Sequence, residues 1–138
     1  MSYRVFIPTC EKYYPALRCM AFMMHRYWHP GPEVVVAGYS LPPFELPPRW
    51  GFYSIGVQED YPFGKWSDAL IEFVSGMDDE VFLLMLEDMW PIRPVDTGAL
   101  DILYGYMRQF GYVAKMDLCG DRLYAMGMRP YGYVGRLD

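Results

Sequence analysis

The feature that most constrains the fold is an unbroken apolar segment, residues 82–86 (FLLML), which leads directly into two carboxylates, Glu87 and Asp88. Five consecutive apolar side chains without polar alternation are typical of a strand that is covered on both faces. Such strands occur in parallel sheets that have helices on both sides. We therefore predict that residues 80–86 form a strand in the middle of a parallel sheet, and that the two carboxylates stand where this strand emerges.

The remaining elements alternate between strand and helix patterns. Short β-branched or aromatic runs predict strands, and apolar residues at helical spacing predict helices. The other predicted strands cover residues 3–8, 33–38, 50–55, 112–118 and 122–126, and the predicted helices cover residues 15–28, 66–77 and 97–110. This order predicts an α/β fold with a mostly parallel central sheet flanked by helices. We expect its core to contain Val5, Ile7, Val35, Val36, Phe82, Leu84 and Leu86.

Composition excludes several classes of protein. The chain of 138 residues is 53% hydrophobic, which is too apolar for a disordered protein, and none of its apolar runs is long enough to span a bilayer. The net charge is −5 and no Lys/Arg cluster occurs, so we expect no nucleic-acid binding. The three cysteines lack C-x-x-C spacing, and the N-terminal sequence has no secretory signal pattern. We therefore expect reduced thiols and a cytoplasmic location.

The paired carboxylates suggest a metal site. Ligands of parallel α/β sheets bind at the carboxyl ends of the strands, which is where Glu87 and Asp88 are expected. Carboxylate oxygens suit Mg²⁺ or Mn²⁺, and such an ion can bridge to a diphosphate. The alternative interpretation is that both residues are solvated turn residues that end an apolar strand.

Residues 82–96 (FLLMLEDMWPIRPVD), which follow residues 64–80 (GKWSDALIEFVSGMDDE), resemble glycosyltransferases of the GT-A fold, the nucleotide-diphospho-sugar transferases. In that family a hydrophobic strand delivers a D-x-D or E-D-like motif that binds a metal ion and the sugar nucleotide. The resemblance covers the order of elements from Tyr3 to about Met126, although Glu87-Asp88-Met89 stands in place of D-x-D. It implies a divalent cofactor, Mn²⁺ or Mg²⁺, held by Glu87 and Asp88.

The resemblance also implies residues that bind a nucleotide diphosphate sugar. The loop after the first strand contributes Thr9, Cys10 and Tyr13. The segment after the third strand contributes Asp60, Lys65 and Trp66, and Trp90 lies beside the carboxylates. Trp90 would form a wall for a sugar ring. Five of these residues also have a structural interpretation: a turn for Thr9, cover of the core for Tyr13, a surface charge for Lys65, a lid for Trp90 and, as the better interpretation, helix packing for Trp66.

The implied function is transfer of a sugar from a nucleotide diphosphate sugar to an unknown acceptor. We expect a single GT-A-like domain, residues 1–138, that lacks a C-terminal acceptor part or completes its site by homo-oligomerisation, because little chain follows Met126. The alternative is a non-catalytic binding or structural module that retains the fold. Three tyrosines near the C-terminus leave room for its interface, Tyr124, Tyr131 and Tyr133.

Two further hypotheses are weaker. A phosphotransfer domain could use Asp88, but Thr9 and Cys10 stand where a nucleophilic aspartate would follow the first strand. His25 and His29 have a spacing compatible with a shared metal ion, yet no third ligand lies nearby in the sequence.

Overall fold

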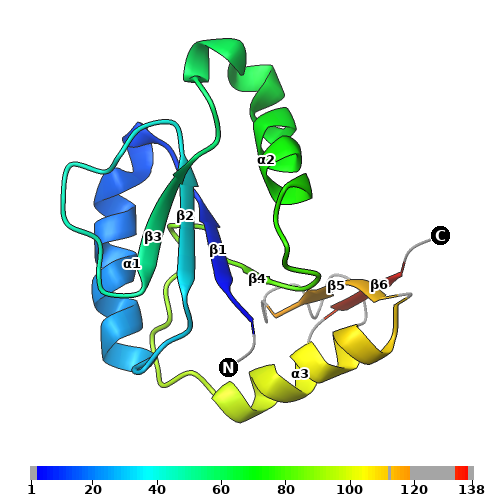
Figure 1. The fold of residues 1–138 in the computed structure, drawn as a ribbon. Helices are drawn as coiled ribbons and strands as arrows, with labels where there is room; N and C mark the ends of the chain where they lie inside the picture. The colour runs from blue at the N-terminus through cyan, green and yellow to red at the C-terminus, as the bar shows by residue number, and fades with distance from the viewer. Residues whose placement is uncertain (1–2, 112, 119–132, 137–138) are drawn as a thin grey trace. The chain divides into compact units, whose positions relative to one another are not determined.

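The structure is a computed structural model that describes residues 3–111, 113–118 and 133–136 (Figure 1). The chain divides into two compact units, Met1–Val95 and Asp96–Asp138, which are called the first unit and the second unit below. The assignment of one GT-A-like domain to the whole chain stays a prediction.

The first unit is built on a four-stranded sheet in which every pairing is parallel. Its strands are β1 (Val5–Pro8), β2 (Val34–Gly38), β3 (Trp50–Ser54) and β4 (Leu83–Leu84), in the order β3-β2-β1-β4. The register aligns Val5 with Val34 on one side and with Leu83 on the other. The predicted α/β fold with a parallel sheet is therefore confirmed.

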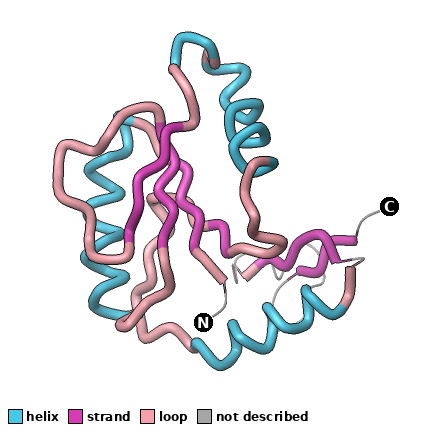
Figure 2. Tube along the Cα trace, viewed as in Figure 1, coloured by secondary structure: helices cyan, strands magenta, loops and turns pink. Residues whose placement is uncertain are grey.

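Two helices cover opposite faces of this sheet, α1 (Tyr14–Tyr27) and α2 (Trp66–Ser75) (Figure 2). Side chains alternate between faces along a strand, so Phe6, Val35 and Ala37 share one face. The apolar stripe of α2 packs against that cluster, and the rings of Phe6 and Phe73 stack with centroids 5.7 Å apart. The other face meets buried side chains of α1, namely Leu17, Met20 and Met24.

The prediction of a central strand over residues 80–86 is wrong in both length and position. β4 contains only two residues and lies at the edge of the sheet, where it pairs with β1 alone. An apolar run indicates that side chains avoid water, but it does not say how many neighbouring strands are available. Here β2 and β3 both lie on the other side of β1, so β4 has one partner.

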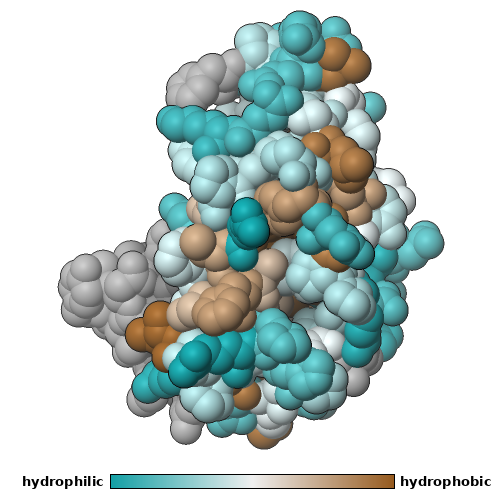
Figure 3. Space-filling model, turned by 90° about the vertical axis from the view of Figure 1, so that its left-hand side faces the viewer, coloured by the Kyte–Doolittle hydropathy of each residue, from teal (hydrophilic) through white to brown (hydrophobic). Residues whose placement is uncertain are grey.

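The predicted core is correct for the two central strands and wrong for part of the apolar run. Val5, Ile7, Val35 and Val36 are buried and Phe82 is half-buried. Leu84 is 55% exposed and Leu86 is 41% exposed, because edge strand β4 leaves their side uncovered. On the face drawn in Figure 3, apolar residues lie among hydrophilic ones.

The second unit contains α3 (Thr97–Gln109) and an antiparallel pair, β5 (Val113–Asp117) with β6 (Tyr133–Arg136). Asp96 caps α3, since its carboxylate accepts a hydrogen bond of 2.9 Å from the Ala99 amide. The predicted strand over residues 122–126 lies outside the described residues, as do Tyr124 and Tyr131; Tyr133 begins β6. In the described ranges no helix is long and apolar enough to cross a membrane.

Candidate functional site

The strand order places a topological switch point between β1 and β4. From β1 the chain continues to β2 and β3 on one side, whereas β4 lies on the other side, which is a topological switch point. Thr9 and Cys10 follow β1 directly. The Met85 amide donates to the Phe6 carbonyl at 3.0 Å, so the pairing extends past β4 toward Glu87. The structure thus places Thr9 and Cys10 on the same side of the sheet as Glu87 and Asp88. This side, formed by the carboxyl ends of the strands, is called the carboxyl edge below, and the opposite side, formed by their amino ends, is called the amino edge.

Glu87 is the buried member of the acidic pair. Its residue is 8% exposed, whereas Asp88 is exposed. Burial raises the pKa of the Glu87 carboxyl and the neighbouring Asp88 charge raises it further, while a hydrogen bond from its own backbone opposes the change. The Trp90 indole donates to the Glu87 carbonyl at 2.7 Å, which fixes the turn. A carboxylate held in this way is stabilised by a proton or by a cation.

Thr9 is the second buried polar residue at this edge, with 7% exposure. Its amide donates to the Ala37 carbonyl at 2.8 Å, but its hydroxyl is buried without a hydrogen-bond partner in the part of the chain that is described. A Cβ on Gly38 would lie 3.1 Å from the Thr9 carbonyl oxygen, so β2 approaches Thr9 closely. The hydroxyl therefore does not satisfy a turn, and its hydrogen-bonding capacity is left for another group.

Tyr39, which directly follows β2, was not identified from the sequence. Its hydroxyl is also buried without a hydrogen-bond partner within the described residues, and burial raises its pKa, with a smaller contribution from Cys10. Its ring stacks on that of Tyr61, with centroids 6.4 Å apart. The sequence could have indicated Tyr39, because it directly follows the buried run VVVAG and therefore lies at the same end of the strands as Thr9.

The remaining predicted binding residues are exposed. Tyr13 is 41% exposed and carries Lys12 over its ring at 5.3 Å, so it does not cover the core. Asp60 and Lys65 are also exposed. Trp66 is 55% exposed, so the packing interpretation is wrong: the helix stripe makes its buried contacts only from Ala69 onward. Trp90, 40% exposed, is the one aromatic predicted for the site that is bonded to the acidic turn.

The donor set for a metal ion is small. Among the described residues no three His, Cys, Asp or Glu side chains lie close enough together to hold a metal ion. Glu87 and Asp88 can supply two carboxylates at most. His25 and His29 have ring centroids 5.0 Å apart in an edge-to-face arrangement, and both are exposed.

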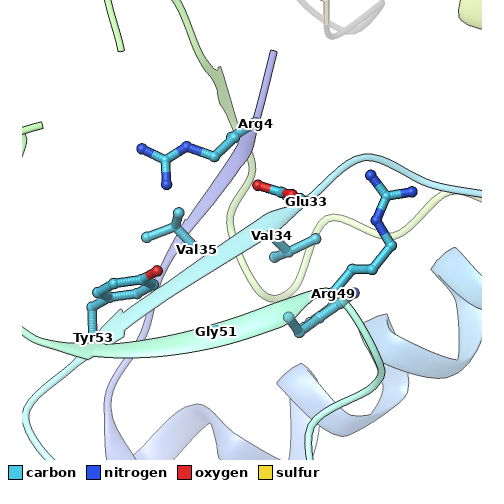
Figure 4. Close-up of a pocket in the computed structure, with 8 residues that line it drawn as sticks. Arg4, Glu33, Val34, Val35, Arg49, Gly51 and Tyr53 are labelled. Atoms are coloured by element: carbon cyan, nitrogen blue, oxygen red, sulfur yellow. The ribbon is translucent and has the colours of Figure 1, made fainter. Parts of the chain in front are cut away.

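A hollow of about 280 Å³ lies at the amino edge, near the amino ends of the strands (Figure 4). Its walls include Arg4, Glu33, Arg49 and Tyr53. Arg4 is paired there: its Nε donates to both carboxylate oxygens of Asp79, at 3.0 and 3.1 Å. This pairing lowers the pKa of Asp79 and raises that of Arg4. The hollow and the predicted site residues therefore occupy opposite edges.

Comparison with protein-family models, with curated proteins and with solved structures found no match for this chain. The GT-A resemblance therefore rests on the sequence motif alone.

Proposed function

We propose that the first unit binds a nucleotide diphosphate sugar at the carboxyl edge of its sheet and takes part in sugar transfer. One observation carries this proposal: the two buried polar residues Thr9 and Glu87 follow the two strands that flank the switch point. The Thr9 hydroxyl is buried without a hydrogen-bond partner among the described residues, and burial raises the pKa of the Glu87 carboxyl, so a ligand that supplied a hydrogen-bond partner and a cation would stabilise both groups. The GT-A resemblance names a ligand of matching chemistry.

The acidic turn would hold a divalent ion, Mg²⁺ or Mn²⁺, between the protein and the diphosphate. Asp88 is exposed, and burial raises the pKa of the Glu87 carboxyl, a change that a bound cation would oppose. The residues present thus fit a hard cation, with the diphosphate and water as its other ligands. The ion, when bound, would stabilise the charge that develops on the leaving phosphate.

The uncharged parts of the ligand would meet the hydroxyls of Thr9 and Tyr39, which have donor and acceptor capacity left. Cys10 lies next to Thr9 and close to the Tyr39 hydroxyl. On the other side, the Trp90 ring is anchored by its hydrogen bond to Glu87 and offers an exposed apolar surface to the sugar. The diphosphate of the ligand would be contacted by the remaining predicted residues, Asp60, Lys65 and Trp66.

Calorimetric titration tests the metal arm of this proposal. Uridine and guanosine diphosphate sugars are titrated with and without Mn²⁺ into wild type and Asp88→Asn, which removes one charge and keeps the size of the side chain. Loss of a metal ligand should weaken binding by about 10- to 100-fold in the presence of Mn²⁺ only. Glu33→Gln is the matched control, because Glu33 is an exposed carboxylate at the amino edge.

Equal affinities for wild type and Asp88→Asn under both conditions would contradict the metal site. Hydrolysis or transfer of the sugar, measured in the same samples, separates the enzyme from the alternative of a binding module. Binding without turnover at saturating ligand would favour the module.

A further inference from the structure

A short hydrogen-bonded chain joins the loops that leave β1 and β2. The Tyr14 hydroxyl donates to the Ser40 carbonyl and lies 3.1 Å from Ser40 Oγ, while Ser40 Oγ donates to Glu11 Oε1 at 2.6 Å. Each hydroxyl has a single hydrogen, and both hydrogens are used, one on the carbonyl and one on the carboxylate. We call these three residues, Glu11, Tyr14 and Ser40, the loop latch.

The loop latch lies beside the unpartnered hydroxyls. Glu11 belongs to the 3₁₀ turn η1 (Glu11–Tyr13), two residues after Thr9, and Ser40 directly follows Tyr39. The connection from β2 to β3 then continues through residues 41–48 (LPPFELPP), whose four prolines restrict its backbone. The latch therefore holds the chain at Ser40, directly after Tyr39, where this stiff connection begins.

We propose that Tyr14, acting through Ser40, is a positioning residue for the nucleotide site. Its role is to hold the Tyr39 hydroxyl at the carboxyl edge, where Thr9 presents its own. Tyr14 is 6% exposed and its hydroxyl hydrogen is committed to Ser40, so it does not contact the ligand. This inference rests on the proposed function, because it concerns the affinity of the same site.

The ring and the hydroxyl of Tyr14 have separable roles. The buried ring contributes to the packing of α1, alongside Leu17. Tyr14→Phe keeps the ring and removes only the hydroxyl, so it opens the latch with little loss of packing. Ser40→Ala removes the hydrogen bond from Ser40 Oγ to Glu11 and the contact of that oxygen with the Tyr14 hydroxyl, but keeps the Ser40 carbonyl that accepts from Tyr14, in a residue that is only half-buried. Ser40→Thr keeps a hydroxyl and should restore the bond to Glu11.

Calorimetry with uridine diphosphate and guanosine diphosphate, with Mn²⁺ present, compares wild type, Tyr14→Phe, Ser40→Ala and Ser40→Thr. We expect about tenfold weaker binding for Tyr14→Phe and for Ser40→Ala, as for one lost hydrogen bond, and near-wild-type affinity for Ser40→Thr. Tyr27→Phe is the control, since this half-buried tyrosine lies at the far end of α1. Thermal melts confirm that each variant is folded.

The outcomes separate the two proposals. Wild-type affinity in both Tyr14→Phe and Ser40→Ala, with clear binding by wild type, would overturn the positioning role and leave the proposed function intact. Failure of wild type to bind either nucleotide would overturn both. A loss that Ser40→Thr does not restore, or that Tyr27→Phe shares, would mean that α1 packing rather than the latch determines affinity, and would overturn the positioning role.

Discussion

Polar side chains at the amino edge and at the carboxyl edge of the parallel sheet in the first unit differ in their hydrogen bonding. At the amino edge, Arg4 and Asp79 form a two-pronged ion pair, and the remaining charged groups of the hollow, Glu33 and Arg49, are exposed. At the carboxyl edge, the hydroxyls of Thr9 and Tyr39 are buried without partners among the described residues. The indole nitrogen of Trp28, which follows α1, is also buried without a partner among the described residues, so the difference between the two edges concerns their hydroxyl and charged groups.

The comparison also shows that volume and chemistry need not coincide. The amino-edge hollow of about 280 Å³ shares Arg4, Val35 and Tyr53 with a second hollow of about 400 Å³ beside α2. The charged residues that line the two hollows are either paired, as Arg4 is with Asp79, or exposed to water. Among the described residues, the carboxyl edge brings together two buried hydroxyls without hydrogen-bond partners and a carboxyl group whose pKa is raised by burial. This combination, rather than hollow size, is the basis for placing the site there.

The largest effect is expected where the carboxyl edge is most tightly packed. In Gly38→Ala, the new Cβ would meet the Thr9 carbonyl oxygen at 3.1 Å and the Phe52 ring at 3.3 Å. Because the first neighbour is backbone, we expect a loss of about 2 kcal/mol in unfolding free energy and weaker nucleotide binding as Thr9 shifts. Urea denaturation measures the first effect and calorimetry the second.

Gly64→Ala is the control for that substitution, since a Cβ there meets nothing within 4 Å. An equal loss of stability in both variants would mean that the contact between Gly38 and Thr9 is not responsible.

Removing the ion pair at the amino edge should affect stability and leave binding unchanged. Asp79→Asn should cost about 1 kcal/mol at neutral pH, because the pair is only partly buried. The folded pKa of Asp79 is lowered, so its contribution is present above the ordinary carboxyl pKa and is lost as pH falls through the lowered value. Wild type and variant should therefore converge in acid, as measured by denaturation across pH.

Asp78→Asn, a change at the exposed neighbouring residue, serves as the control for the ion pair. A change in nucleotide affinity with Asp79→Asn alone would show that the amino edge takes part in binding.

The smallest effect concerns Glu87. Its folded pKa is raised, so the folded protein binds more protons than the unfolded chain and loses stability as pH rises from the ordinary carboxyl range through the raised value. Glu87→Gln lacks this loss and should melt slightly higher than wild type at neutral pH without metal. Mn²⁺ should raise the melting temperature of wild type more than that of the variant. A lower melting temperature for metal-free Glu87→Gln would contradict this account.

Much of the fold followed from local patterns. β1, β2 and β3, α1 and α2 lie within two residues of their predicted limits, because β-branched runs and helical spacing are local signals. The position of β4 was not predictable in this way. The burial of Leu84 depends on which strands pair beside it, and the sequence run carries no information on pairing.

The candidate site was predicted in part for the same reason. The prediction that Thr9 and Glu87 belong to a site rests on the rule that ligands bind at the carboxyl ends of parallel strands. The order of the strands places the ends of β1 and β4 side by side. Tyr39 obeys the same rule but was overlooked because its ring resembles a core residue in a sequence. The helix-packing interpretation of Trp66 was wrong because helical spacing indicates a face without showing how far along the helix that face is covered.

Amide resonance mapping tests the central claim most directly, because it reports on both edges in one experiment. Uridine diphosphate and guanosine diphosphate, each with Mg²⁺, are titrated into ¹⁵N-labelled protein of 16.1 kDa. We predict that resonances of Thr9, Tyr39 and Glu87 shift with saturation, while those of Arg4, Glu33 and Arg49 do not. Saturable shifts confined to the amino edge, or none at either edge, would contradict the placement of a nucleotide site at the carboxyl ends of β1 and β4.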